Sequence, residues 1–495
     1  MVSILIFIAA LALMVQAFIG LTFFISCIWE KEKRATVFAG LQFLGMLALV
    51  VVFFFLRGID FFETKLGLAL LIAGLIFGAL AAFLLIRKTT PNQRVLEAAR
   101  GLIVGKVKRH DEREIVFARN RSLRPDSEQY KLFYKEHPEY EEFDAKRRKM
   151  GGPLGHPGTI DRPHQGSNVA ATLASLSIPL HLSAPDKVKP QAYPELRGKK
   201  ISLSPEEATE RVKGYARNLG ADLVGITEVN PLWIYSHRGE IFHEDWKDWG
   251  KEIKVEHKYG VVFAMEMSFE MVGTAPHTPT MIESIHNYAK GAYIATQLAS
   301  FIANLGYSST ANHLRNYEAL MVPLAVDAGL GELGRLGYLI TKDFGPRVRL
   351  GAVTTDLPLI PDKPVDIGVE DFCRICKKCA VCCPSNSIPL EKDQTVVNGM
   401  LRWKLNAETC FEYWGNIGTD CNICMRVCPW SHARTFPHKL ILELITRNKI
   451  SRRLFSFMDD LFYGKRPKPR GAPKWARFNT GNMDDIKNPA RSDIH

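Results

Sequence analysis

Charged residues are missing from most of the first 86 positions of this 495-residue chain. Three apolar runs, at residues 2–29, 35–56 and 66–86, contain no Asp, Glu, Lys or Arg. Each run is long enough to cross a bilayer, which takes roughly 20 apolar residues in a helix. Because long helices of a soluble core are rarely so free of charge, we predict three transmembrane helices here.

Export signals are missing as well. The residues ahead of the first run carry no basic charge, and the run itself is too long for a cleaved signal peptide. The paired arginines of the chain, Arg147-Arg148 and Arg452-Arg453, lie too far from the start to serve as a twin-arginine signal. The apolar runs are therefore expected to remain as a membrane anchor.

The loop charges predict an orientation. The first connection carries Lys31, Lys33 and Arg34, whereas the second carries only Arg57 and Lys65. The third run is followed by many basic residues: Arg87, Lys88, Arg94, Arg100, Lys106, Lys108 and Arg109. Because positive loops stay inside, we expect a multi-pass protein of the cell (inner) membrane with its large C-terminal part in the cytoplasm.

The formal net charge of +12 leaves two kinds of partner to consider. Nucleic acid is one, but the surface of an anionic lipid membrane explains the basic excess equally well. The basic segment at residues 465–477 is either another lipid contact or a solvated surface tail. With three membrane spans present, we expect the lipid membrane and no nucleic acid.

Cysteine is nearly absent outside one short region, because nine of the ten cysteines fall between Cys373 and Cys428. Their spacing follows the bacterial ferredoxin pattern, in which three cysteines hold one cluster and the fourth reaches the other cluster. One [4Fe–4S] cluster is assigned to Cys373, Cys376, Cys379 and Cys428. The other is assigned to Cys383, Cys410, Cys421 and Cys424. The pattern predicts a protein that transfers electrons.

Two alternatives to this assignment remain open. Structural zinc is one, although zinc favours separate Cys-x-x-Cys pairs in tetrahedral sites. Cys382 lies beside Cys383, so the ligand there is one of these two neighbours. The ligands are thiolates, so the region needs reducing surroundings and is not expected to form a disulfide framework.

The middle of the chain predicts a compact region with helices and strands. Residues 89–200 are polar and rich in proline, and we expect an irregular wrap with a helical portion near 127–150. Apolar periodicity then predicts helices and strands. The expected helices are 205–219 and 283–305, and the expected strands are 223–226, 259–265, 321–326 and 348–354. A helical extension is expected from about residue 437.

Gly329, Gly331 and Gly334 form a literal G-x-G-x-x-G. A dinucleotide site needs a helix to begin at the third glycine. Gly337 and Gly345-Pro346 interrupt too soon for such a helix, so a Rossmann site is rejected. The glycines remain candidates for close approach to a bulky cofactor.

Several sequence blocks, standing in one order with the cysteine motifs, resemble the cobalamin-dependent reductive dehalogenases. They are LGADLVGI at 219–226, WIYS at 233–236, VPLAVDAGLGE at 322–332 and GPRVRL at 345–350. The likeness runs from about residue 111 through the cysteine region. It implies an oxidoreductase that removes halide from an organohalide with a low-valent cobalt corrinoid and two iron–sulfur clusters.

The resemblance also implies an α+β fold with a nitroreductase-like corrinoid-binding domain and a ferredoxin-like domain. The expected segments are a membrane anchor at 1–88, a linker and wrap at 89–200, a catalytic domain at 201–366, a two-cluster domain at 367–436 and an extension at 437–495. The corrinoid is expected in its base-off form, which agrees with the lack of an Asp-x-His-x-x-Gly motif for a histidine ligand.

Three residues match the family's reaction site. Tyr288 aligns with its proton-donating tyrosine, Asn316 with its site asparagine, and Arg349 with the cation that assists the tyrosine. Arg347 is the alternative candidate for the role of Arg349. It is also a candidate for cofactor binding, together with Gly329, Gly331 and Gly334. Taken one by one, the same residues are also typical of a core tyrosine, a loop asparagine and a surface arginine.

The front of the chain departs from the family. Typical members carry an export signal and dock on a separate three-helix anchor protein, whereas here three apolar runs precede the enzyme-like part. The electron donor is expected to be a ferredoxin, a flavodoxin or a quinol-linked protein, as in organohalide respiration. The competing hypotheses are an epoxyqueuosine reductase-like enzyme and a membrane electron-transfer subunit without a substrate site.

Overall fold

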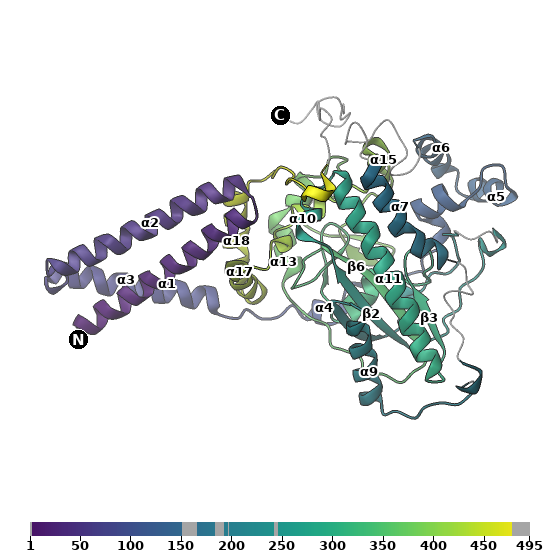
Figure 1. Cartoon of the computed structure of the whole chain (residues 1–495), viewed down its shortest axis with the longest axis horizontal. Helices are drawn as coiled ribbons and strands as arrows, with labels where there is room; N and C mark the ends of the chain where they lie inside the picture. Colours follow the sequence, from purple (N-terminus) through teal and green to yellow (C-terminus); the bar gives the residue numbers. More distant parts are fainter. Residues whose placement is uncertain (1, 151–165, 184–192, 197, 242–245, 478–495) are drawn as a thin grey trace. The chain divides into compact units, whose positions relative to one another are not determined.

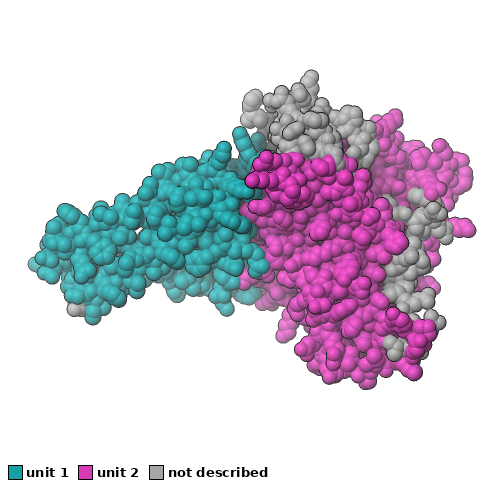
Figure 2. Space-filling model, in the orientation of Figure 1, with its two compact units in different colours: residues 1–91, 367–376, 432–470 teal, residues 92–366, 377–431, 471–495 magenta. Residues whose placement is uncertain are grey.

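The computed structural model describes residues 2–150, 166–183, 193–196, 198–241 and 246–477. The described chain divides into two compact units, coloured separately in Figure 2. Unit 1 comprises residues 1–91, 367–376 and 432–470, and unit 2 comprises 92–366, 377–431 and 471–495. Each unit is therefore assembled from segments far apart in the sequence.

Unit 1 begins with three long helices, α1 (Val2–Trp29), α2 (Lys33–Gly58) and α3 (Lys65–Ile86), drawn in purple and blue in Figure 1. All three are long and apolar enough to cross a membrane. Thr64 begins α3 by accepting a hydrogen bond from the backbone N–H of Gly67 at 3.0 Å, which satisfies a free donor at the helix start. The three predicted helices are confirmed as helices suited to a membrane anchor.

The rest of unit 1 is helical too. It contains α13 (Val369–Cys376), α17 (Phe436–Arg447) and α18 (Lys449–Tyr463). The helices predicted from about residue 437 are thus confirmed as far as Tyr463, and residues 478–495 lie outside the described residues. The end of α1 packs on α18 through a small core that includes Cys27, Phe462 and Tyr463. Asn448 begins α18 by accepting bonds from the backbone N–H groups of Ile450 and Ser451.

Unit 2 is built on a four-stranded antiparallel sheet with the order β1-β2-β6-β3. The strands are β1 (Leu223–Glu228), β2 (Tyr259–Glu266), β6 (Val348–Thr355) and β3 (Ser309–Asn312). Alternate residues of β2 face opposite sides, as the two-residue period of a strand requires. Phe263 joins the core beneath α9 (Pro205–Asn218) and α11 (Thr278–Asn304), while Val262 joins the core beneath α12 (Met321–Asp327).

The other elements of unit 2 surround this layered core. The helices are α4 (Gln93–Leu96), α5 (Glu128–Glu136), α6 (Glu141–Lys149), α7 (Gly166–His181), α10 (Phe269–Val272), α14 (Lys378–Val381), α15 (Ala407–Ile417) and α16 (Ile423–Arg426). The short strands are β4 (Glu332–Leu333), β5 (Leu339–Ile340), β7 (Thr395–Val397) and β8 (Met400–Arg402). The chain is therefore a mixed α+β protein, as predicted.

One strand prediction is wrong. The apolar run at 321–326 forms helix α12 rather than a strand, and it packs Leu324 and Ala325 against the sheet. A short apolar run suits either structure, and only its place against the sheet decides between them. Strand β3 and helix α7 were not predicted, because neither has a clear apolar period in the sequence.

The glycine-rich segment after α12 forms a turn and a hairpin. β4 and β5 pair with Leu333 opposite Leu339, so the third glycine does not begin a helix. A Cβ atom on Gly331 would lie 2.2 Å from the carbonyl oxygen of Ile340. Glycine is therefore needed at this position to let the two backbones approach, and the rejection of a Rossmann helix is confirmed.

Candidate active site

Four buried or half-buried cysteines of unit 2 gather in one place. They are Cys383, Cys410, Cys421 and Cys424. Burial, together with the charge of Cys383, raises the pKa of Cys410 to about 12. Burial also raises the pKa of Cys421, with added contributions from the other three thiols. The structure thus brings together the four cysteines that the spacing assigned to one cluster.

The chemistry of these four thiols fits an iron–sulfur cluster. Four thiolates form the usual ligand set, and N–H donors to sulfur tune such clusters. The backbone N–H of Ser387 lies 3.3 Å from Cys383 Sγ in this way. Cys421 and Asn422 both have a positive φ, 64° and 56°, which a non-glycine residue adopts only where its surroundings hold it.

The remaining predicted ligands are divided between the units. Cys373 and Cys376 lie on α13 of unit 1, whereas Cys379 and Cys428 belong to unit 2. Their assignment to a common cluster stays a prediction. Cys382 is buried at the end of α14.

Tyr288 and Arg349 lie together in unit 2, as predicted. Tyr288 is on α11 and Arg349 is on β6, which are neighbouring layers of the same core. The guanidinium carbon of Arg349 lies 5.0 Å from the centre of the Tyr288 ring. This distance is typical of a cation–π contact. The arginine is thus close enough to favour the negative charge that develops on a phenol when it gives up its proton.

Arg349 is held from two sides. Its Nη2 donates to Ser284 Oγ at 2.8 Å and lies 3.5 Å from Asp420 Oδ2. Burial opposes its charge, but Tyr288 and Asp420 raise its pKa overall, so the guanidinium stays charged. Its Nε has no hydrogen-bond partner among the described residues. A buried donor without a partner costs about 1–3 kcal/mol, so this one suits a site that a bound molecule completes.

Asn316 lies in the loop after β3, and Arg315 directly precedes it. Asn316 Oδ1 accepts a bond of 2.9 Å from Arg238, while its Nδ2 has no hydrogen-bond partner among the described residues. Burial lowers the pKa of Arg315 to about 10, and Tyr288 is among the groups that act on it. The structure therefore brings a second arginine, which the sequence did not single out, to the neighbourhood of Tyr288.

Tyr338 links this group of residues to the four cysteines. Burial raises its pKa well above the ordinary value, with the charges of Cys424, Cys410, Arg349 and Tyr288 all acting on it. Tyr338, Ser284 and Asp420 were missed in the sequence. The one local signal was that Asp420 directly precedes Cys421, a predicted ligand.

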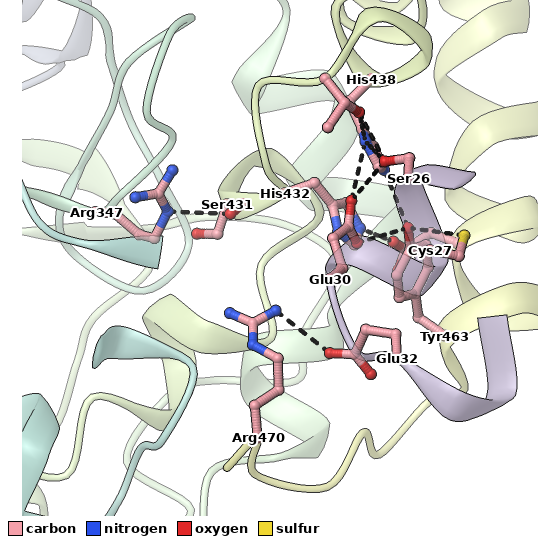
Figure 3. Close-up of polar contacts among 12 residues, drawn as sticks. Ser26, Cys27, Glu30, Glu32, Arg347, Ser431, His432, His438, Tyr463 and Arg470 are labelled. Carbon is pink, nitrogen blue, oxygen red and sulfur yellow. Dashed lines mark hydrogen bonds and ion pairs between the residues drawn. The ribbon is translucent and has the colours of Figure 1, made fainter. Parts of the chain in front are cut away.

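The predicted cofactor-binding residues have protein contacts of their own. Arg347 Nε donates to the carbonyl oxygen of Ser431 at 3.0 Å (Figure 3), and its Nη1 donates to Glu266 at 3.1 Å. Gly329 and Gly334 approach Lys363 and Ile340 closely. These contacts account for the residues within the fold, and their role in cofactor binding stays a prediction.

Four cysteines, a tyrosine and a buried arginine thus lie within one α+β unit. The chain is related in sequence to curated reductive dehalogenases. It is 35% identical over 277 residues to the tetrachloroethene reductive dehalogenase of Desulfitobacterium hafniense, covering 48% of this chain and 50% of that protein. It is 34% identical over 314 residues to the enzyme of the same name from Sulfurospirillum multivorans, covering 57% and 62%.

A shorter stretch of 120 residues is 33% identical to the epoxyqueuosine reductase of Cyclobacterium marinum, covering 23% of this chain and 37% of that protein. The match to the dehalogenase from Desulfitobacterium hafniense spans about half the length of that protein. No family model matches it.

Solved structures of reductive dehalogenases share the fold. The catabolic reductive dehalogenase NpRdhA in complex with 3-bromo-4-hydroxybenzoic acid aligns with a TM-score of 0.58 and 26% identity, covering 81% of this chain and 55% of that one. A reductive dehalogenase structure described as suggesting a mechanism for B12-dependent dehalogenation aligns with a TM-score of 0.54 and 26% identity, covering 77% and 54%. The chain is therefore a homologue of reductive dehalogenases.

Proposed function

We propose that this protein is a membrane-anchored reductive dehalogenase. It removes halide from an organohalide with a base-off corrinoid and with electrons relayed by two [4Fe–4S] clusters. The observation that carries the proposal is the continuity of one buried group in unit 2. The four cysteines, Tyr338, Arg349 and Tyr288 act on one another electrostatically, so electron delivery and proton delivery meet in one place.

The proposed cofactors match the residues available. Cys383, Cys410, Cys421 and Cys424 hold one cluster, and Cys373, Cys376, Cys379 and Cys428 hold the other. Arg349 and Asn316 have buried N–H donors without partners among the described residues, and such donors suit a bound group that accepts hydrogen bonds. When bound, the low-valent cobalt supplies the electrons that break the carbon–halogen bond. In this proposal, the catalytic part is nitroreductase-like and the cysteine region is ferredoxin-like.

Tyr288 supplies the proton in this reaction. Two electrons and one proton convert the carbon–halogen bond into a carbon–hydrogen bond and a free halide, so one acid is needed in each turnover. Arg349 lies 5.0 Å from the ring and favours the phenolate that remains. Ser284 and Asp420 fix the arginine in that position, and a proton from solvent restores the phenol.

Asn316 and Arg315 orient the substrate. The Nδ2 donor of Asn316 and the cation of Arg315 lie in one loop, beside each other in sequence. Groups of this kind stabilise negative charge as it develops on a departing halide. In this proposal the substrate is an organohalide, and the buried donors rather than a basic surface decide its orientation.

The three apolar helices of unit 1 anchor the protein in the cell (inner) membrane as a multi-pass protein. The loop charges favour a cytoplasmic catalytic part. A ferredoxin, a flavodoxin or a quinol-linked protein is the electron donor, because each delivers single electrons at a potential suited to iron–sulfur clusters. Organohalide respiration is the process that such an arrangement serves.

The test is halide release by the anaerobically reconstituted full chain, with a low-potential electron donor and a panel of haloalkenes and haloarenes. The expected result is release of one halide ion per two electrons consumed. Turnover of an epoxyqueuosine-containing tRNA without halide release would favour the competing reductase instead. A protein that binds no corrinoid and exchanges electrons without turnover would favour the electron-transfer subunit.

A further inference from the structure

A second buried polar cluster lies in unit 1, where the first apolar helix ends. We call it the Glu30 cluster. It gathers side chains from α1 and its end, from the segment before α17, and from α17 and α18. The members labelled in Figure 3 are Ser26, Glu30, His432, His438 and Tyr463. Thr435 and Asp459 complete the cluster. All but two of them are less than a tenth exposed, so water does not satisfy most of these groups.

Three of these side chains are arranged as metal ligands. Glu30, His432 and His438 each offer one donor atom, and the three atoms lie within 4.8 Å of one another. Glu30 Oε1 lies 3.3 Å from His438 Nδ1. Two ligands that are each about 2.0–2.1 Å from a tetrahedral zinc ion lie roughly 3.3–3.4 Å apart. The Glu30–His438 pair is therefore already at ligand spacing.

The remaining members of the cluster orient the two imidazoles. Asp459 Oδ1 lies 2.6 Å from His432 Nε2, which leaves Nδ1 of that ring to bind a metal. Tyr463 Oη lies 3.0 Å from His438 Nε2, and the Nδ1 of His438 lies 3.3 Å from Glu30 Oε1 and 2.8 Å from Thr435 Oγ1. A carboxylate or another polar group on the far nitrogen is the usual support of a metal-binding histidine.

The charges agree with a divalent cation. Glu30 is a buried acid, and burying a carboxylate is costly unless a cation lies close to it. Arg470 pairs with Glu32 at 3.3 Å and also acts on Glu30 electrostatically. A divalent ion bound at this position would balance the charge of Glu30.

The geometry points to a divalent first-row metal site at Glu30, His432 and His438, with Asp459 and Tyr463 as supporting residues. A ligand set of two imidazoles and one carboxylate suits zinc and similar ions and differs from the all-thiolate sets of unit 2. The bound ion ties the end of α1 to α17 and α18. This site is independent of the dehalogenation proposed above.

The test uses zinc on the reconstituted full chain in detergent. Zinc is measured after dialysis against a weak chelator, and X-ray absorption at the zinc edge reports its ligands. We expect about one zinc per chain, with nitrogen and oxygen neighbours at about 2.0 Å and the outer-shell pattern of imidazole. Zinc surrounded by sulfur at about 2.3 Å would instead mark binding at the cysteines and would overturn the assignment.

Variants locate the ion. Glu30→Gln and His438→Gln should lose the bound zinc while the iron content stays unchanged, and Asp459→Asn should weaken zinc binding about 10- to 100-fold. His181→Gln, an exposed histidine at the end of α7, is the matched control and should keep the zinc. Zinc retained by both Glu30→Gln and His438→Gln would overturn the proposal. The absorption spectrum of the unchanged protein decides the question even if a variant fails to fold.

Discussion

In unit 1 the large apolar side chains of the first three helices lie on the outside, whereas in unit 2 side chains of the same kind lie inside. Phe7 of α1 and Phe77 of α3 are 67% and 74% exposed, but Phe263 of β2 and Leu298 of α11 are fully buried. The difference follows from the surrounding solvent. A lipid bilayer accepts exposed apolar surface, and water does not.

The buried polar groups of the two units differ as well. In unit 1 the side chains of the Glu30 cluster contact one another, with Tyr463 donating to Glu30 at 3.1 Å. In unit 2 the group around Tyr288 leaves Nε of Arg349 and Nδ2 of Asn316 without partners among the described residues. Buried donors without partners therefore mark the group around Tyr288, whereas the members of the Glu30 cluster bond to one another.

The largest effect is expected for Cys424→Ala in unit 2. Removing one of the four gathered thiols should lower the iron content from about eight to about four per chain and abolish halide release, because two cubanes hold eight irons. Cys382→Ala is the control and should keep all of the iron. Loss of iron in Cys382→Ala would mean that Cys382, rather than its neighbour Cys383, belongs to the ligand set. Unchanged iron in Cys424→Ala would contradict the role of Cys424 as a ligand.

Tyr288→Phe comes next. The change keeps the ring on α11 and removes only the hydroxyl group, so the iron and corrinoid contents should remain normal. Loss of a general acid typically lowers the rate about 10²- to 10⁴-fold, and kcat for halide release should fall by this amount. Full activity in Tyr288→Phe would return this tyrosine to an ordinary packing role.

Arg349 and Asp420 form a buried pair at 3.5 Å, and breaking it should destabilise unit 2. We expect Arg349→Met to cost about 3–5 kcal/mol in the free energy of unfolding, because it leaves a buried carboxylate unpaired. The double variant Arg349→Met, Asp420→Asn should recover most of this stability without recovering activity. Recovery of both would show that the arginine only balances charge.

The outward apolar face of unit 1 can be tested with Phe77→Arg. An arginine at the centre of a transmembrane helix costs about 2.5–3.5 kcal/mol for insertion, so less protein should remain in the membrane after alkaline extraction. Leu66→Arg, at the start of the same helix, is the matched control and should insert normally. Equal extraction of both variants would contradict a membrane-spanning α3.

The last prediction concerns the pH dependence of stability and Glu112 of unit 2. Burial raises the pKa of Glu112 to about 8, so the folded protein holds a proton there that the unfolded chain loses above its ordinary pKa of 4.5. Stability should therefore be greatest below pH 4.5 as far as this group is concerned, fall as the pH rises towards about 8, and level off beyond it. Thermal unfolding of Glu112→Gln should lack this contribution. An unchanged pH profile in the variant would contradict it.

The sequence by itself determined the local features of this protein. The apolar runs predicted α1, α2 and α3, since a membrane helix needs only length and apolar composition. Alternation and periodicity predicted β2 and α11, because these patterns are written in neighbouring residues. The cysteine spacing selected Cys383, Cys410, Cys421 and Cys424, which the fold then brings together.

Only the tertiary structure decided which distant residues meet. It made a helix of residues 321–326, because the sheet offers that segment a face to cover. It set Tyr338 and Asp420 around Arg349, and it brought His438 to Glu30 across most of the chain. A single polar residue carries no local period, so its partner is chosen by the packing of whole elements and by the cost of burying a charge alone.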